Sequence, residues 1–247
     1  MDSVAIVTGG SRGIGRATAL ASAKRGYKVV VGYASNKPAA DEVVAKIEAS
    51  NGKAIAVKCD VGIEADILRL FKESDNFGKL GALVNNAGVV DKTARVDEMS
   101  AERLTRMMNI NIVGSILCAR EAVKRMSTNH GGTGGVIVNL SSVAATLGSP
   151  GLYVDYAASK GAIDTFTVGL AREVSTEGIR VNAIRPGLID TDIHASGGEP
   201  DRAHRLAHMV PMKRVGTADE IANAVVWLMS DEASYVTGTI FDVSGGR

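Results

Sequence analysis

The chain has 247 residues, of which 45% are hydrophobic and 22% are charged, with a formal net charge of +1. This length and composition suit one large α/β domain with a substantial core. The charge balance excludes a basic surface for nucleic acid, and an aromatic fraction of 4% leaves few side chains for base stacking.

Nothing in the sequence predicts a membrane anchor, a leader or a disulfide. No apolar run reaches the roughly 20 residues that span a bilayer, and the first predicted strand begins at Val4, which leaves no room for a signal peptide. Cys59 and Cys118 are interpreted as buried thiols, without a Cys-x-x-Cys or metal-ligand pattern. We therefore expect a cytoplasmic protein without a metal.

The first predicted element is a buried strand at Val4–Val7, followed by a glycine-rich bend. Gly9, Gly13 and Gly15 have the spacing G-x3-G-x-G, and a helical pattern begins near Ile14. Glycine permits the left-handed backbone of a tight strand-to-helix turn, and the resulting helix N-terminus presents N–H groups to a phosphate. A plain βα turn is the alternative, but the position after a buried strand favours phosphate binding.

The rest of the chain alternates between strand and helix patterns. Strands are predicted over 28–33, 54–59, 82–84, 136–140, 180–184 and 240–243, and helices over 16–26, 38–50, 64–76, 101–126, 153–176 and 219–229. This alternation predicts one α/β domain over 1–247, a doubly wound parallel sheet of the Rossmann type with helices on both faces. The segment 192–212 is interpreted as a substrate lid with a short helix from about Asp201.

Polar residues follow five of the predicted strands, at the edge where ligands bind in such a sheet. They are 8–15, Asp60, 85–88, Ser141 with Ser142, and 186–191. Each group alone is compatible with turn chemistry, but their shared placement favours a common site.

Tyr156 and Lys160 are four residues apart on a predicted helix and so lie on one face. An ammonium near a phenol lowers the phenol pKa, which would make Tyr156 an acid/base near neutral pH. The alternative is a tyrosine and a lysine that merely share a helix surface.

Several motifs now occur in one order along essentially the whole chain: T-G-G-S-R-G-I-G, N-N-A-G, S-S before Y-A-A-S-K, R-P-G-L-I-D-T, and T-G-T-I-F-D-V-S-G-G. With them the chain resembles the short-chain dehydrogenase/reductase family, in particular its 3-oxoacyl-carrier-protein reductases and sugar 1-dehydrogenases. The resemblance implies an oxidoreductase that transfers a hydride reversibly between NADP and a small carbonyl or secondary alcohol. Alternatives are an NAD(P)-dependent sugar or polyol dehydrogenase, and a non-catalytic dinucleotide-binding sensor or scaffold.

The resemblance also implies four catalytic residues. Ser142 would bind the substrate oxygen, Tyr156 would be the acid/base, Lys160 would bind the nicotinamide ribose and lower the tyrosine pKa, and Asn111 would hold a water beside the lysine. A sensor has no need of this set, which argues for an enzyme.

Ser142 is preferred to its neighbour Ser141 because the family pattern favours the second serine. Ser142 lies fourteen positions before Tyr156, one more than in many relatives, so we expect the loop 148–155 to bulge. Tyr153 is assigned to the pocket wall, and Asp155 to a helix cap or a solvent-facing group.

The expected cofactor contacts run along the same edge. They are Gly9, Ser11, Arg12, Gly13, Ile14, Gly15, Ser35, Asn36, Lys37, Asp60, Val61, Asn86, Ala87, Gly88, Tyr156, Lys160, Pro186, Gly187, Ile189 and Thr191. The resemblance assigns Asp60 to the adenine amine, 86–88 to the adenine ribose, and Ile189 and Thr191 to the nicotinamide carboxamide.

NADP is predicted over NAD, which remains the alternative. No carboxylate follows the second strand before Asp41, so none is expected to repel a 2′-phosphate. Arg12 and Lys37 would supply positive charge, and Ser35 and Asn36 hydrogen bonds. The alternative is that both cations are solvated surface charges.

Two further expectations concern metals and assembly. His204 and His208 are four apart but lack a third ligand, so an exposed helix face is favoured over a metal site. The resemblance implies a homotetramer that pairs its long helices, near 107–126 and 156–176. Ala157, Ala158, Gly161 and Ala162 form a small-residue face there.

Overall fold

The computed structural model describes residues 3–191, 197–199 and 201–247. Its strands form one parallel sheet in the order β3-β2-β1-β4-β5-β6-β7. They are β1 Val4–Val7, β2 Lys28–Tyr33, β3 Ala54–Lys58, β4 Leu80–Asn85, β5 Gly135–Leu140, β6 Ile179–Pro186 and β7 Ile240–Val243. The predicted doubly wound sheet is confirmed, with each predicted strand in place.

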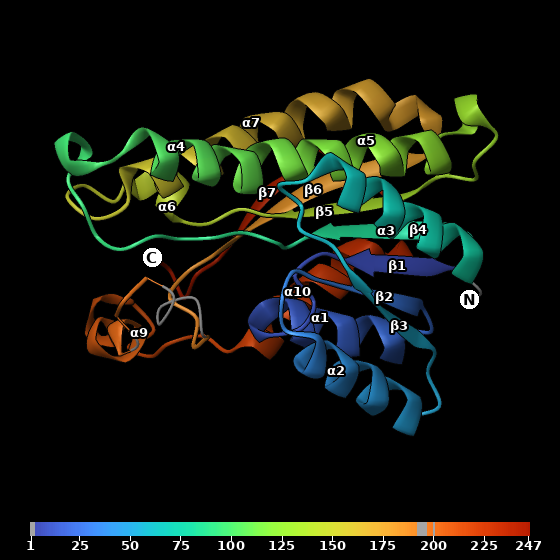
Figure 1. Cartoon of the computed structure of the whole chain (residues 1–247), viewed down its shortest axis with the longest axis horizontal. Coiled ribbons are helices and arrows are strands. Elements are labelled where there is room, and N and C mark those ends of the chain that lie inside the picture. The colour runs from blue at the N-terminus through green and yellow to red at the C-terminus, as the bar shows by residue number, and fades with distance from the viewer. Residues whose placement is uncertain (1–2, 192–196, 200) are drawn as a thin grey trace.

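Helices cover both faces of this sheet (Figure 1), with α1, α2 and α10 on one side and α3, α5 and α7 on the other. Their bounds are α1 Gly13–Lys24, α2 Lys37–Ala49, α3 Glu64–Phe77, α4 Ala101–Met108, α5 Gly114–Met126, α6 Ala144–Leu147, α7 Val154–Val174, α9 Arg202–Arg205 and α10 Ala218–Met229. No helix in the described part of the chain is long and apolar enough to cross a membrane.

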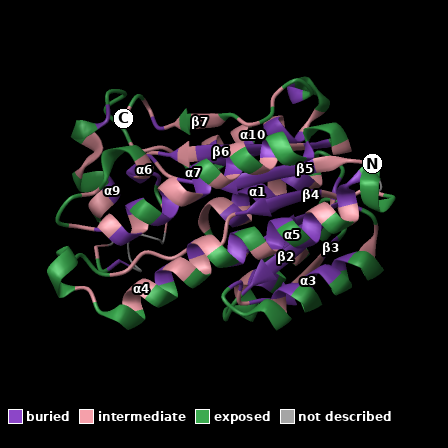
Figure 2. Ribbon diagram, turned by 90° about the horizontal axis from the view of Figure 1, so that it is seen from above, coloured by how far each residue is buried: buried purple, intermediate pink, exposed green. Residues whose placement is uncertain are grey.

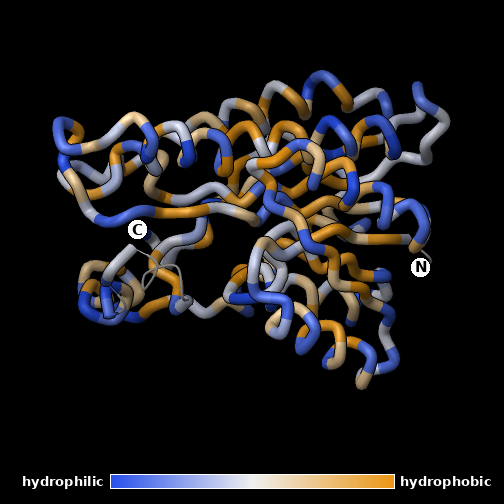
Figure 3. The backbone as a smooth tube through the Cα atoms, viewed as in Figure 1, coloured by the Kyte–Doolittle hydropathy of each residue, from blue (hydrophilic) through white to orange (hydrophobic). Residues whose placement is uncertain are grey.

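The core lies in two layers, because a parallel sheet is buried on both faces. Alternate residues of β1 show this: Ala5 and Val7 belong to the cluster under α1, α2 and α10, whereas Val4 and Ile6 belong to the cluster under α3, α5 and α7. The central strands are accordingly mostly buried (Figure 2) and mostly hydrophobic (Figure 3), while the outer helix faces are exposed.

The helical stretch predicted over 101–126 is present, but its middle is not regular α-helix. α4 and α5 are joined by a π-helical stretch, Asn109–Val113, which adds a residue to the turn without breaking the helix. The short helix α6 was also not predicted. In the loop after it, Gly148, Ser149 and Gly151 all have positive φ, of 70°, 48° and 70°.

The strand order places the functional edge. The chain leaves β3 at one edge and re-enters the sheet at β4, on the other side of β1, which makes the carboxyl ends of β1 and β4 the switch point where ligands bind in such folds. In Figure 1 this edge faces α6 and α9. The predicted lid over 192–212 lies partly outside the described residues; its described part holds α9 and a 3-10 turn at Ala207–Met209.

Candidate active site

A cavity of about 160 Å³ opens at this edge. It brings together ten of the predicted site residues: Ile14, Asn86, Gly88, Ser142, Tyr156, Lys160, Pro186, Gly187, Ile189 and Thr191. Tyr153 lines it as predicted, and Leu147, Arg202 and Arg247 line it as well. The other predicted residues are not among those that line this cavity.

The glycine loop has the geometry of a phosphate cradle. Gly9 and Gly13 have positive φ, of 61° and 52°, which other residues rarely adopt. A Cβ at Gly15, in the first turn of α1, would overlap the Gly9 carbonyl oxygen and the Asn86 amide, so only glycine fits at this position. Arg12 is the N-cap of α1; its side chain makes no capping hydrogen bond, and the first turn holds no acidic residue. The first turn of α1 therefore suits an anion.

Thr8 and Asn86 tie this loop to the end of β4. The Thr8 hydroxyl accepts from the N–H groups of Asn86 and Ala87, both at 3.0 Å. The Asn86 side chain donates to the carbonyls of Thr8, at 2.8 Å, and Gly9, at 3.0 Å. The two residues thus hold the two loops of the switch point together, a role that no local sequence pattern predicts.

The residues after β2 and β3 are engaged in local contacts. Asn36 caps α2 by accepting from the Ala39 N–H at 3.1 Å, and the exposed Lys37 pairs with Asp41 at 2.6 Å. Asp60 accepts from the Gly62 N–H at 2.9 Å. Lys37 therefore already faces a carboxylate.

Ser142 and Tyr156 meet inside the cavity. Burial raises the pKa of Tyr156, while a hydrogen bond from Ser142 and the charge of Arg202 oppose that rise. The direction is opposite to the one predicted from sequence, because desolvation of the phenolate outweighs the nearby charges. Tyr156 is thus protonated at neutral pH. The neighbouring Ser141 is buried and donates to the Lys160 carbonyl at 3.2 Å.

Lys160 is buried beneath this tyrosine. Its Nζ donates to the Leu140 carbonyl at 2.6 Å and lies 5.6 Å from the centroid of the Tyr156 ring. Burial lowers the pKa of Lys160 to about 8, although the charge of Asp164 opposes this. An ammonium kept in so unfavourable an environment points to a functional role.

The π-helical stretch positions Asn111. Its Oδ1 accepts from the Val89 N–H at 2.8 Å, and its Nδ2 donates to the Val89 carbonyl at 3.0 Å and to the Ser159 hydroxyl at 3.1 Å. Ser159 in turn donates to the Tyr156 carbonyl at 2.7 Å. A Cβ at Gly88 would lie 3.4 Å from Asn111 Oδ1 and 3.6 Å from Lys160 Nζ, so glycine keeps the space between them open.

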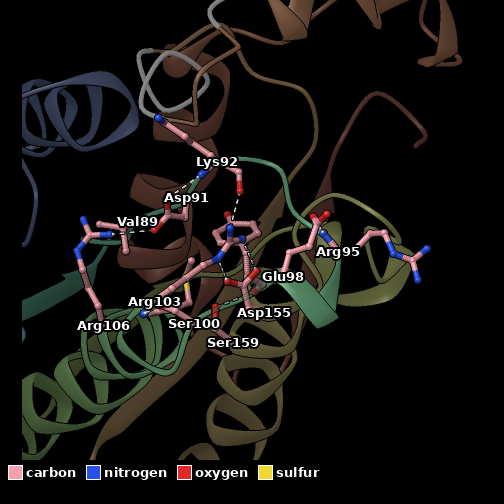
Figure 4. A network of polar contacts seen from close by, with 12 residues as sticks. Val89, Asp91, Lys92, Arg95, Glu98, Ser100, Arg103, Arg106, Asp155 and Ser159 are labelled. Carbon is pink, nitrogen blue, oxygen red and sulfur yellow. Dashed lines mark hydrogen bonds and ion pairs between the residues drawn. The ribbon is translucent and has the colours of Figure 1, made fainter.

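The structure corrects the expectation that Asp155 is a helix cap or a solvent-facing group. Its carboxylate accepts backbone N–H bonds in the first turn of α7, as a cap would, but its side chain is fully buried rather than solvent-facing. Figure 4 shows Arg103 of α4 pointing at it, with a bidentate pair at 2.8 and 3.1 Å. Burial opposes the charged form, but these bonds keep the pKa of Asp155 low. Arg103 also donates to the Lys92 carbonyl at 2.6 Å.

The described residues contain no group of three or more His, Cys, Asp and Glu that could hold a metal ion. His204 lies 3.4 Å from Asp190, whereas the His208 ring contacts the Arg205 carbonyl at 3.1 Å. Cys59 and Cys118 are buried free thiols, and burial raises the pKa of both. Neither thiol is an activated nucleophile.

Comparisons with known proteins find relatives that match almost the whole chain. A family model described as enoyl-(acyl carrier protein) reductase matches residues 9–247. An uncharacterized oxidoreductase of Escherichia coli K12, YgfF, is 54% identical over 99% of both chains. A 3-oxoacyl-[acyl-carrier-protein] reductase of Synechocystis is 40% identical, over 98% of this chain and 96% of its own. Glucose 1-dehydrogenase 2 of Bacillus subtilis is also 40% identical, over 98% of this chain and 93% of its own.

The fold comparison gives the same result. A short-chain dehydrogenase of Burkholderia cenocepacia, solved in complex with NADP, superposes with a TM-score of 0.90 and 32% identity, covering 100% of this chain and 98% of its own. The chain therefore belongs to the short-chain dehydrogenase/reductase family and is an oxidoreductase that acts on CH-OH groups.

Proposed function

We propose that the protein transfers a hydride reversibly between NADP and a carbonyl or secondary alcohol, with Tyr156 as the acid/base. One observation carries the proposal: Ser142, Tyr156 and the buried Lys160 meet in one cavity, on the same sheet edge as the glycine loop. A structural tyrosine and lysine on a helix surface would not be desolvated in this way.

The residues present fit a dinucleotide. The uncapped first turn of α1 suits the pyrophosphate, and the missing side chains at Gly13 and Gly88 leave backbone open beside Thr191 and Lys160. Pro186 and Ile189 would border the nicotinamide.

In reduction, the chain's own residues handle the substrate oxygen. The bound nicotinamide supplies the hydride to the carbonyl carbon. Ser142 and Tyr156 donate hydrogen bonds to the carbonyl oxygen where negative charge develops, and Tyr156 gives its proton to that oxygen. The Lys160 ammonium lies beneath the tyrosine ring and stabilises the phenolate that remains. Alcohol oxidation follows the same path in reverse.

NADP rather than NAD is supported by two observations. The exposed Arg12 stands at the N-cap of α1, and the similar Burkholderia cenocepacia enzyme was solved in complex with NADP. The buried thiols support a reducing compartment such as the cytoplasm.

A sugar or polyol dehydrogenase is the second candidate, because a glucose 1-dehydrogenase is among the relatives at 40% identity. Steady-state kinetics separate the candidates: NADPH oxidation with acetoacetyl thioesters and simple diketones, against NADP and NAD reduction with glucose. Turnover of glucose alone would favour the sugar enzyme. Cofactor binding without turnover of any compound in a broad carbonyl and alcohol panel would favour a sensor or scaffold.

A further inference from the structure

Two arginines stand at the substrate end of the cavity. Arg202 comes from α9 and Arg247 from beyond β7, and both line the same cavity as Tyr156. The Arg202 guanidinium stacks over the Tyr153 ring, 5.2 Å from its centroid. Tyr153 is buried, so the stack holds the guanidinium at the cavity wall.

Neither guanidinium forms an ion pair with a carboxylate in the part of the chain that the structure describes. The nearby Glu199 is already engaged, with Arg205 and with the Tyr153 hydroxyl. The two guanidiniums are close enough that, together with burial, the charge of Arg202 lowers the pKa of Arg247.

Two like charges that converge on one cavity repel each other unless an anion lies between them. We propose that Arg202 and Arg247 form an anion subsite, which selects carbonyl or alcohol substrates that carry a carboxylate or phosphate group. The inference rests on the proposed function, since it concerns the substrate of the same cavity. Arginine suits the role because its planar fork binds both oxyanions in bidentate fashion.

Ligand-binding measurements test this proposal without requiring the enzyme to turn over. Calorimetry on the Tyr156→Phe enzyme with NADP compares 4-oxopentanoate with its methyl ester, and dihydroxyacetone phosphate with dihydroxyacetone. We expect at least one anion to bind roughly tenfold or more tighter than its neutral partner. The pair that shows the larger preference for its anion tells whether the subsite selects a carboxylate or a phosphate.

Variants made in the Tyr156→Phe enzyme test whether the two arginines cause the preference for anions. Arg202→Gln or Arg247→Gln should remove it and leave binding of the neutral partner unchanged, whereas Arg202→Lys should keep part of it. Arg25→Ala, which deletes an exposed guanidinium at the far end of α1, is the charge-matched control and should leave it intact. Equal affinity within both pairs, or an anion preference that survives both glutamine variants, overturns the subsite.

The corresponding wild-type kinetics keep the two proposals apart. If no carbonyl is reduced but the anion preference depends on Arg202, the proposed function fails and the subsite stands. If ketones are reduced with no preference for charge in binding, the subsite fails and the function stands.

Discussion

At the scale of single residues, Lys160 combines strong desolvation with a proposed catalytic role. Its pKa falls from 10.5 to about 8 in the folded chain, so the proton that it holds at neutral pH opposes folding. Between pH 8 and 10.5 the folded chain is neutral there while the unfolded chain is still charged, so rising pH favours the folded state.

We therefore expect the unfolding free energy of the wild type to rise relative to Lys160→Met by about 3 kcal/mol across that window. Urea denaturation at pH 7.5, 9 and 10.5 measures this difference. A constant difference between the two proteins would show that Lys160 titrates as it does in the unfolded chain.

Tyr156→Phe removes the hydroxyl that would donate the proton in the proposed reaction, while the ring and its packing stay. We expect turnover to fall by roughly 100- to 10,000-fold, with cofactor affinity preserved. Stopped-flow NADPH oxidation and fluorescence titration of NADPH measure the two quantities. Turnover close to that of the wild type would exclude Tyr156 as the acid/base.

Arg12 carries the prediction of cofactor choice. With one substrate, kcat/KM for NADPH should exceed that for NADH, and Arg12→Ala should reduce this ratio by roughly tenfold or more, the value of a charge-assisted hydrogen bond. Lys37→Ala is the comparison, because Lys37 is paired with Asp41 and should matter less. A preference for NADH, or a preference for NADPH that Arg12→Ala leaves untouched, would contradict the assignment.

Other single-residue roles could not be predicted because they depend on distant partners. Asp155 pairs with Arg103, 52 positions away, and Thr8 bonds the Asn86 N–H, 78 positions away. Local sequence marks Asp155 only as a polar residue at a helix start. Its burial follows from how α4 packs on α7, which no local pattern encodes.

At the scale of elements, this pair joins the site to α4. Replacing Arg103 by methionine leaves the Asp155 carboxylate buried and unpaired, which we expect to cost about 3–5 kcal/mol of stability. The double variant Arg103→Met/Asp155→Leu removes both charges and should recover most of that loss. Thermal or urea unfolding of the three proteins tests this; a double variant no more stable than Arg103→Met would show that the charge pair is not the cause.

The elements themselves were largely predictable, since most residues of the strands are apolar and strand-like segments alternate with helical ones along the chain. β2 and β7 have their predicted bounds. The π-helical stretch was missed because the apolar pattern continues on both sides of it, so only the backbone reveals the extra residue. α6 was missed because four residues are too few for a periodic pattern.

At the scale of the whole molecule, the surface of α7 carries the prediction of assembly. A Cβ at Gly161 or Gly169 would meet nothing within 4 Å, so both glycines face open space in the single chain, while Ala157 is buried within it. Ile116 of α5 and Val113, the last residue of the π-helical stretch, are exposed. A homotetramer formed through these two helices would cover this surface.

Light scattering should therefore give about four times the 25.7 kDa of one chain. Gly161→Arg, which the single chain has room to accept, should lower that mass. A mass of one chain for the wild type would contradict the prediction. A Gly161→Arg variant that stays tetrameric would exclude this position from the contact.

The π-helical stretch has a last consequence, for alignments. A π-helical turn holds one residue more than a regular α-helical turn, so deleting one residue other than Asn111 from 109–113 would close the stretch into a regular α-helix. Side chains within the stretch would then point in other directions, and the Asn111 amide would lose its contacts with Val89 and Ser159. An alignment of such a shortened sequence would still show all four proposed catalytic residues identical, although the geometry that connects them had been lost.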